Sequence, residues 1–130
     1  MKTKRLLVSV LALLLLGCSH GPLGSLVGAD RDEHGCLGSA GYVWSGALHQ
    51  CVRLWEAAER IESGKKAVYL LFSIDSTYAE VFTPDSAVLC RRDKGASATW
   101  RARKSPECVT VTDGMVMVRA CDTTFTKLVR

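Results

Sequence analysis

The chain has 130 residues, enough for one domain with a hydrophobic core and near the size at which disulfides add useful stability. Its formal net charge is +4, from 17 basic and 13 acidic residues. The one Gly-x-Ser-x-Gly match, at Gly17–Gly21, follows directly on the N-terminal apolar run and is not the turn between a strand and a helix that a hydrolase nucleophile needs. No His-Glu-x-x-His motif and no Cys-x-x-Cys pair is present. We therefore expect a non-enzymatic protein without a cofactor.

The first residues have the layout of a signal peptide. Lys2, Lys4 and Arg5 precede an uncharged apolar stretch from Leu6 to Leu16. A membrane-spanning helix needs roughly 20 apolar residues, so this stretch is too short to remain as a span. We expect residues 1–17 to be removed. The three basic residues leave with them, which takes the formal charge from +4 to +1 and gives no support to a nucleic-acid partner.

The apolar stretch ends in Leu15, Leu16, Gly17 and Cys18, which resemble the lipobox of bacterial lipoproteins. The resemblance implies that Cys18 begins the mature chain and carries fatty acids such as palmitate, so that the membrane is a partner through lipid. The residue after Cys18 is Ser19, whereas an aspartate at this position would resemble the signal that retains lipoproteins in the inner membrane. We therefore expect the outer membrane, with the domain in the periplasm or at the cell surface. An ordinary secretory signal with an accidental cysteine is the alternative.

A flexible tether and one globular domain are expected after the signal. Residues 18–31 contain the lipidated cysteine followed by Gly, Ser, Pro and small apolar residues without a period, whereas residues 32–130 form the domain. The domain begins with a glycine-rich and aromatic segment between Cys36 and Cys51. An oxidising envelope favours a disulfide between these two cysteines, which would close a local loop.

The next segments change from a helical to a strand period. The apolar spacing from Val52 to Ser63 predicts one short helix. Beyond Gly64 the period changes to two, with one face shared along 68–74 and alternation along 98–103, and the short runs 78–82 and 87–90 are predicted as strands between them. The result is a mostly β fold, with α+β as the alternative: an antiparallel meander or small barrel with a bridged N-terminal loop.

Asp113 and Gly114 predict a two-residue hairpin turn, because this dipeptide adopts positive backbone angles readily. In that register four valines share one face: Val109, Val111, Val116 and Val118. The other face of the hairpin carries Cys108, and Cys121 follows one step further along the chain on that same side. We therefore predict a Cys108–Cys121 disulfide and a spare Cys90, although an exchange of Cys90 for Cys108 stays open.

Two chemical alternatives involve the cysteines. His34, Cys36, His49 and Cys51 form two His-x-Cys pairs and could ligate zinc or copper if the thiols were reduced. The simpler interpretation is the disulfide, with no metal. Cys90 could also be a nucleophile assisted by a histidine, but spare cysteines are usually buried and inert.

Charge is unevenly distributed along the mature chain. The basic residues of the second half are Arg91, Arg92, Lys94, Arg101, Arg103 and Lys104. A solvated surface explains them most simply; a basic edge that faces an anionic partner or the membrane is the functional interpretation.

Two stretches of the chain resemble known families. The run from His34 to Glu56 is similar to small Gram-negative envelope lipoproteins without an assigned function. The following β region resembles the small barrel of membrane-bound inhibitors of c-type lysozyme, on Phe72, Ser73, Ala79, Glu80 and Phe82. The second resemblance implies a fold and a location, and no inhibitory residue is transferred from it.

The leading hypothesis is a lipid-anchored binding or protective module that recognises an envelope protein, a glycan or a lysozyme. Its expected contact residues are Tyr42, Trp44 and Trp55, because aromatic side chains dominate interface energies. Core packing is the alternative role, above all for Trp55. The alternative functions are metal binding and a structural envelope lipoprotein without catalytic activity.

Overall fold

The computed structural model describes residues 30–95 and 97–129. The predicted signal peptide, the lipidated Cys18 and the tether up to residue 29 lie outside these residues. The chain divides between Arg31 and Asp32, and the fold below is that of the unit from Asp32 onward. No helix in the described part is long and apolar enough to cross a bilayer.

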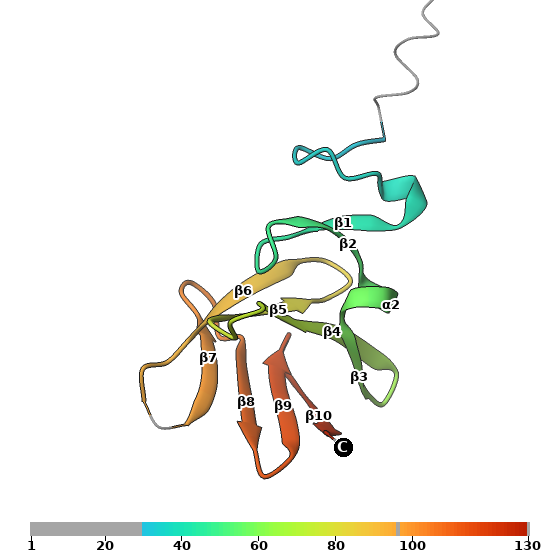
Figure 1. The fold of residues 1–130 in the computed structure, drawn as a ribbon. Helices are drawn as coiled ribbons and strands as arrows, with labels where there is room; N and C mark the ends of the chain where they lie inside the picture. Colours follow the sequence, from blue (N-terminus) through green and yellow to red (C-terminus); the bar gives the residue numbers. More distant parts are fainter. Residues whose placement is uncertain (1–29, 96, 130) are drawn as a thin grey trace, which may run out of the picture. The chain divides into compact units, whose positions relative to one another are not determined.

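An eight-stranded antiparallel sheet forms the body of this unit (Figure 1). Each strand pairs with the next along the chain, so the sheet is an uninterrupted meander, as expected from the alternating segments. Its strands are β3 (Glu59–Ser63), β4 (Lys66–Phe72), β5 (Tyr78–Phe82), β6 (Ala87–Arg92), β7 (Ala98–Ala102), β8 (Cys108–Thr112), β9 (Met115–Ala120) and β10 (Thr123–Leu128).

Side chains nearly close this sheet into a barrel between its edge strands, β3 and β10. The Lys127 ammonium pairs with the Glu59 carboxylate and donates to the Arg60 carbonyl at 3.2 Å. Lys66 Nζ donates to Thr123 Oγ1 at 3.1 Å. Such polar closure covers the exposed edges that an open sheet would offer to other strands.

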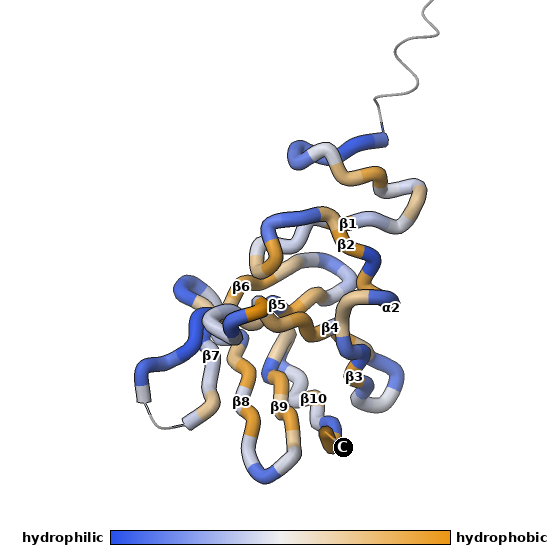
Figure 2. Tube along the Cα trace, viewed as in Figure 1, coloured by the Kyte–Doolittle hydropathy of each residue, from blue (hydrophilic) through white to orange (hydrophobic). Residues whose placement is uncertain are grey.

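The barrel interior is apolar because every second residue of each strand faces it. Figure 2 shows the hydrophobic colour along the strands and the hydrophilic colour in loops such as those beside β7. Phe72 and Trp100 meet edge to face, with ring centroids 4.9 Å apart. The fully or nearly fully buried core consists of Ile61, Val68, Leu70, Ala79, Val81, Cys90, Trp100, Val109, Val116, Val118, Ala120 and Phe125.

The β8–β9 hairpin has the predicted register. Asp113 and Gly114 take φ values of 48° and 76°, and Val111 lies opposite Val116. Val109 and Val118 are also partners, and all four valines pack in the core. Local turn chemistry and valine alternation were therefore sufficient to predict this element.

The predicted Cys108–Cys121 disulfide is not formed, so this part of the predicted cysteine pairing was wrong. Cys108 lies opposite Arg119, whereas Cys121 is two residues further on, in the β9–β10 turn with φ 50°. Diagonal neighbours of this kind are about 7–8 Å apart, beyond the roughly 7 Å that a disulfide spans between Cα atoms. Cys90, Cys108 and Cys121 are free thiols, respectively buried, half-buried and exposed.

The predicted helix is also shorter than its apolar spacing indicated. Only α2 (Leu54–Ala57) is helical, and Glu59–Ser63 forms β3. Ile61 is buried in the barrel opposite Val68, so pairing with β4 prevails over the helical period.

A second, two-stranded sheet precedes the barrel. It consists of β1 (Tyr42–Ser45) and β2 (Gln50–Arg53) and follows the 3-10 turn η1 (Gly38–Ala40). The sequence pattern indicated only an irregular bridged loop here, without these two strands. In Figure 1 the hairpin lies over the part of the sheet formed by β4, β5 and β6.

Candidate functional site

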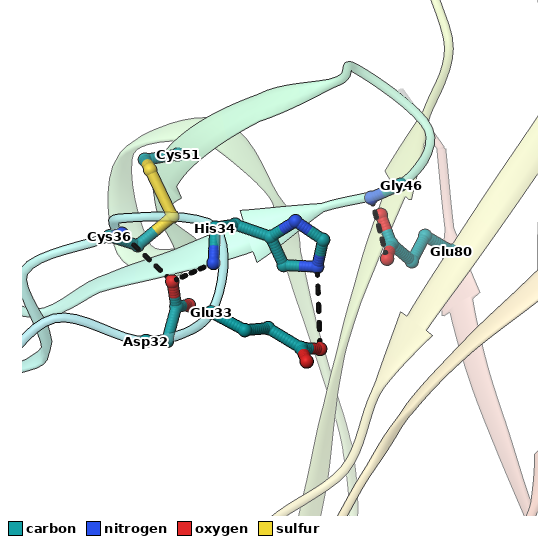
Figure 3. Close-up of polar contacts among 7 residues, drawn as sticks. All are labelled: Asp32, Glu33, His34, Cys36, Gly46, Cys51 and Glu80. Carbon is teal, nitrogen blue, oxygen red and sulfur yellow. Dashed lines mark hydrogen bonds and ion pairs between the residues drawn. A yellow bond between two sulfur atoms is a disulfide. The ribbon is translucent and has the colours of Figure 1, made fainter.

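A buried carboxylate on the outer surface of the barrel holds the hairpin turn. Glu80 of β5 accepts a hydrogen bond from the Gly46 amide at 3.0 Å (Figure 3). It also accepts from Ser45 Oγ at 2.6 Å and from the Ala47 amide at 3.1 Å. Its exposed fraction is only 4%. A buried acid needs such donors, because an unpaired carboxylate is costly away from water. An acidic residue inside an otherwise apolar strand was the available sequence signal for this contact.

The underside of the hairpin forms a second apolar core. Val52 is buried against Leu71 and Phe82 of the barrel, and Val43 packs on the same cluster. These barrel residues belong to the strand faces that point away from the main core. The hairpin is thus bound to the barrel by apolar burial together with the Glu80 contacts.

The predicted Cys36–Cys51 disulfide is confirmed, with Cα atoms 5.5 Å apart. Asp32 organises the chain before it, since its Oδ1 accepts from the amides of His34 at 2.9 Å and Cys36 at 2.8 Å (Figure 3). The bridge ties this segment to β2, so the upper surface of the hairpin is built from two covalently linked stretches.

The predicted contact residues lie together on this upper surface. Tyr42 and Trp44 alternate with the inward-facing Val43, and Tyr42 is the cross-strand partner of Arg53. The Arg53 guanidinium carbon lies 4.5 Å from the Tyr42 ring centroid and 5.9 Å from that of Trp55. We call Tyr42, Trp44 and Trp55, with Arg53 and His34 between and beside them, the aromatic platform.

Arg53 organises the platform, a role that the sequence pattern did not predict. Besides its two ring contacts, its Nε donates to the Ala40 carbonyl at 3.1 Å and a terminal nitrogen pairs with Glu56 at 3.2 Å. A guanidinium held between two rings gains cation–π attraction while it stays accessible. Its position between aromatic residues in the sequence was the only available hint.

His34 extends the platform by stacking on Trp44. The ring centroids are 4.4 Å apart and the planes are inclined by 13°. Glu33 approaches His34 Nε2 at 3.6 Å (Figure 3). Two flat rings are therefore ordered beside the disulfide.

Trp55 is exposed, not packed in the core as the alternative role required. Its exposed fraction is 61%, and its ring lies against the backbone of Gly41. A Cβ at Gly41 would be 2.0 Å from Trp55 Cη2, and φ there is +80°. Glycine is therefore needed at this position both for the turn and for the ring that covers it.

The metal-binding alternative loses two of its four ligands. Both sulfurs of Cys36 and Cys51 are in the disulfide, so neither can ligate a metal. His34 stacks on Trp44, whereas His49 is in the β1–β2 turn with φ 54°. Within the described residues no three His, Cys, Asp or Glu side chains are grouped to hold a metal.

Cys90 is unsuited to nucleophilic catalysis. It is fully buried in the barrel core, and burial together with the Glu107 carboxylate and Cys108 raises the pKa of its thiol to about 11. The nucleophilic form of cysteine is the thiolate, which is scarce at neutral pH with such a pKa. No histidine contact to this thiol occurs among the described hydrogen bonds.

Fold and platform together define a small disulfide-stapled antiparallel β-barrel with an aromatic outer surface. No protein family, no curated protein and no solved structure matches the chain in sequence or fold comparisons.

Proposed function

We propose that this protein is a lipid-anchored module of the bacterial cell envelope whose aromatic platform binds a protein or a glycan. The anchor is inferred from the signal layout and the lipobox at Leu15–Cys18. Binding is inferred from the platform.

The observation that carries the proposal is the placement of large aromatic side chains where neither core needs them. The hairpin is held by Val52 and Glu80 on its underside, while Tyr42 and Trp44 belong to the other face and Trp55 is mostly exposed. Tyr, Trp and Arg are the residue types that contribute most binding energy at protein interfaces. Rings ordered by stacking also lose little conformational entropy on binding.

A c-type lysozyme is the first partner to assay. This choice follows from the resemblance of the β region to lysozyme inhibitors, and a lipoprotein at the cell envelope would be positioned to meet such an enzyme. Purified peptidoglycan is the second probe, because aromatic surfaces also suit the apolar faces of sugars.

The binding experiment uses the unlipidated chain from Ser19 onward, which retains every residue of both cores. Titration with lysozyme and with peptidoglycan is expected to yield binding that Trp55→Ala weakens by about 30-fold, the effect of a roughly 2 kcal/mol hot spot. Ile74→Ala is the matched control, because Ile74 is a 98% exposed apolar residue outside the platform. Equal affinities of the two variants, or no binding of either probe, would count against the proposal.

The anchor is tested separately in a Gram-negative host. The full chain is expected to incorporate labelled palmitate and to fractionate with membranes, and Cys18→Ser should abolish the label. A chain that is secreted in soluble form with an unmodified Cys18 would remove the anchor and leave the binding result unaffected.

A further inference from the structure

A row of arginines crosses the outer surface of the barrel from β6 to β9, and its β6 end borders the hairpin, because Leu89 and Tyr78 line the hollow beside Arg91. Arg91 on β6 is the direct cross-strand partner of Arg101 on β7, Arg101 is opposite Cys108 on β8, and Cys108 is opposite Arg119 on β9. Arg103, just after β7, lines the same hollow as Arg91 and Arg101. We call Arg91, Arg101, Arg103 and Arg119 the arginine face.

The charges of this face are poorly compensated by the protein itself. Arg101 Nε donates to Asp93 at 2.7 Å, but in the described part of the chain no ion pair is formed by Arg91, Arg103 or Arg119. The Arg119 guanidinium donates to the Cys108 sulfur, an uncharged acceptor, at 3.8 Å. Like charges directly opposite each other in a sheet are destabilising, and in this pair only Arg101 has a carboxylate partner, so an external anion beside Arg91 would stabilise the surface.

Apolar side chains are exposed beside the arginines. Leu89 precedes Arg91 by two residues, and Met117 precedes Arg119 by two, so each shares its arginine's face. Leu89, Met115 and Met117 are 41%, 40% and 44% exposed. A surface that combines arginines with exposed Leu and Met resembles the composition of proteins that rest in the interface of a bilayer.

The hollows along the face supply further donors. The larger, of about 470 Å³, is lined by Arg101 and Arg119 together with the hydroxyl-bearing Thr99, Ser105 and Thr110. Guanidinium groups bind phosphate oxygens in a bidentate manner, and hydroxyls complete such sites. Glu107 also lines this hollow, so anions are expected to bind at its arginine side.

We propose that the arginine face binds the phosphate groups of an anionic phospholipid surface. The row crosses three strand spacings, about 14 Å, which is more than a single phosphate occupies and suits an array of headgroups. The inference rests on the proposed anchor only for proximity: the predicted tether over residues 18–31 has a root-mean-square reach of about 20 Å, which would bring the domain near the membrane. The lipid anchor and the arginine face would then act together, as one chain and a basic surface do in other peripheral proteins.

This orientation leaves the aromatic platform available. The hairpin packs on the outer surface of β4 and β5, whereas the arginine row runs from β6 to β9. Figure 1 places β1 and β2 on a different part of the sheet from β8 and β9. Contact with lipid through one face would therefore present the other to a partner.

The test is co-sedimentation of the unlipidated chain from Ser19 with vesicles of phosphatidylglycerol and phosphatidylcholine, and with pure phosphatidylcholine vesicles. Binding is expected only with phosphatidylglycerol present, and it should weaken steeply as salt rises. Arg91→Gln with Arg119→Gln should reduce affinity by about 25-fold, or about fivefold per arginine. The matched control is Lys65→Gln, which removes one charge at the β3–β4 turn and should leave binding nearly unchanged, whereas the single variant Arg91→Gln should lose about fivefold.

Each outcome decides between the proposal and a competitor. Equal losses in Lys65→Gln and Arg91→Gln would mean that net charge alone attracts the chain, which overturns the face. Absence of binding to both vesicles, with binding of a soluble polyanion such as heparin, would assign the arginines to a polyanionic polymer instead. Circular dichroism of each variant guards against unfolding, and Met115→Ser with Met117→Ser, which keeps all charges, should weaken binding at high salt. Vesicle binding needs neither the platform nor Cys18, so its failure is distinct from failure of the proposed function.

Discussion

Replacing Glu80 by glutamine should loosen the hairpin that carries the aromatic platform. One oxygen of Glu80 accepts from Ser45 Oγ and the Ala47 amide, and the other accepts from the Gly46 amide. A glutamine can keep its oxygen at the first position, but its amide group then meets the Gly46 N–H donor to donor. The lost bond and unsatisfied donor cost about 1–3 kcal/mol.

The two remaining bonds also weaken, because hydrogen bonds to a charged acceptor are roughly twice as strong as neutral ones. We therefore expect Glu80→Gln to lower the free energy of unfolding by about 2–4 kcal/mol. With about 4–8 °C per kcal/mol for a domain of this size, the Tm should fall by more than about 8 °C.

Urea and thermal denaturation monitored by tryptophan fluorescence measure this change. Glu62→Gln is the matched control, since Glu62 is exposed and pairs with Arg60 on the surface, a contact worth under about 1 kcal/mol. If Glu80→Gln were as mild as Glu62→Gln, the carboxylate would not be what holds the hairpin, and apolar burial alone would have to explain its docking.

Three further perturbations test individual features. Gly41→Ala and Gly35→Ala both place an alanine at positive φ, of +80° and +82°, but only at Gly41 does the added Cβ meet the Trp55 ring. Gly41→Ala should therefore lower the stability more than Gly35→Ala and change the tryptophan fluorescence. Equal effects of the two variants would refute the contact. Iodoacetamide should alkylate the exposed Cys121 within minutes and Cys90 only after unfolding, because Cys90 is buried and the pKa of its thiol is raised to about 11. Intact mass spectrometry measures the labelling. Rapid labelling of Cys90 in the folded protein would contradict its place in the core. Hydrogen bonds from Thr77 and Ser73 lower the pKa of Asp75 from 3.8 to about 2. The Asp75 carboxylate therefore stabilises the fold at a pH above 3.8, and this contribution is lost as the pH falls toward 2. Asp75→Asn should remove this part of the acid dependence of stability, and an NMR titration of Asp75 with a midpoint near 3.8 would disprove the explanation.

Local patterns were enough to predict most of the barrel. The short, mostly apolar runs near Val68 and Tyr78 and the apolar–polar alternation near Ala98 predicted strands, and β5 has the predicted limits of Tyr78–Phe82. Asp113–Gly114 set the β8–β9 register, since turn geometry and pleat act over a few residues. The Cys36–Cys51 disulfide followed from its short local loop.

Other features depend on partners that are distant in sequence. Ile61 fits a helical stripe as well as a strand, and only pairing with β4 selects β3. The pairing of cysteines near Cys108 depended on a diagonal distance that sequence spacing does not specify. Glu80 contacts residues more than 30 positions away, so its role could not be predicted from its neighbours.

In the candidate site, too, some features could be predicted from the sequence and others depend on the folded structure. The sequence by itself determined that Tyr42, Trp44 and Trp55 are candidate contacts and that Cys36 and Cys51 are paired, because residue type and short spacing carry that information. Only the tertiary structure decided which faces are exposed. Burial of Val52 against the barrel, and of the barrel residue Glu80 beneath the hairpin, turns the aromatic rings outward. The register of four strands aligns the arginines. Both features depend on which surfaces meet in the folded chain.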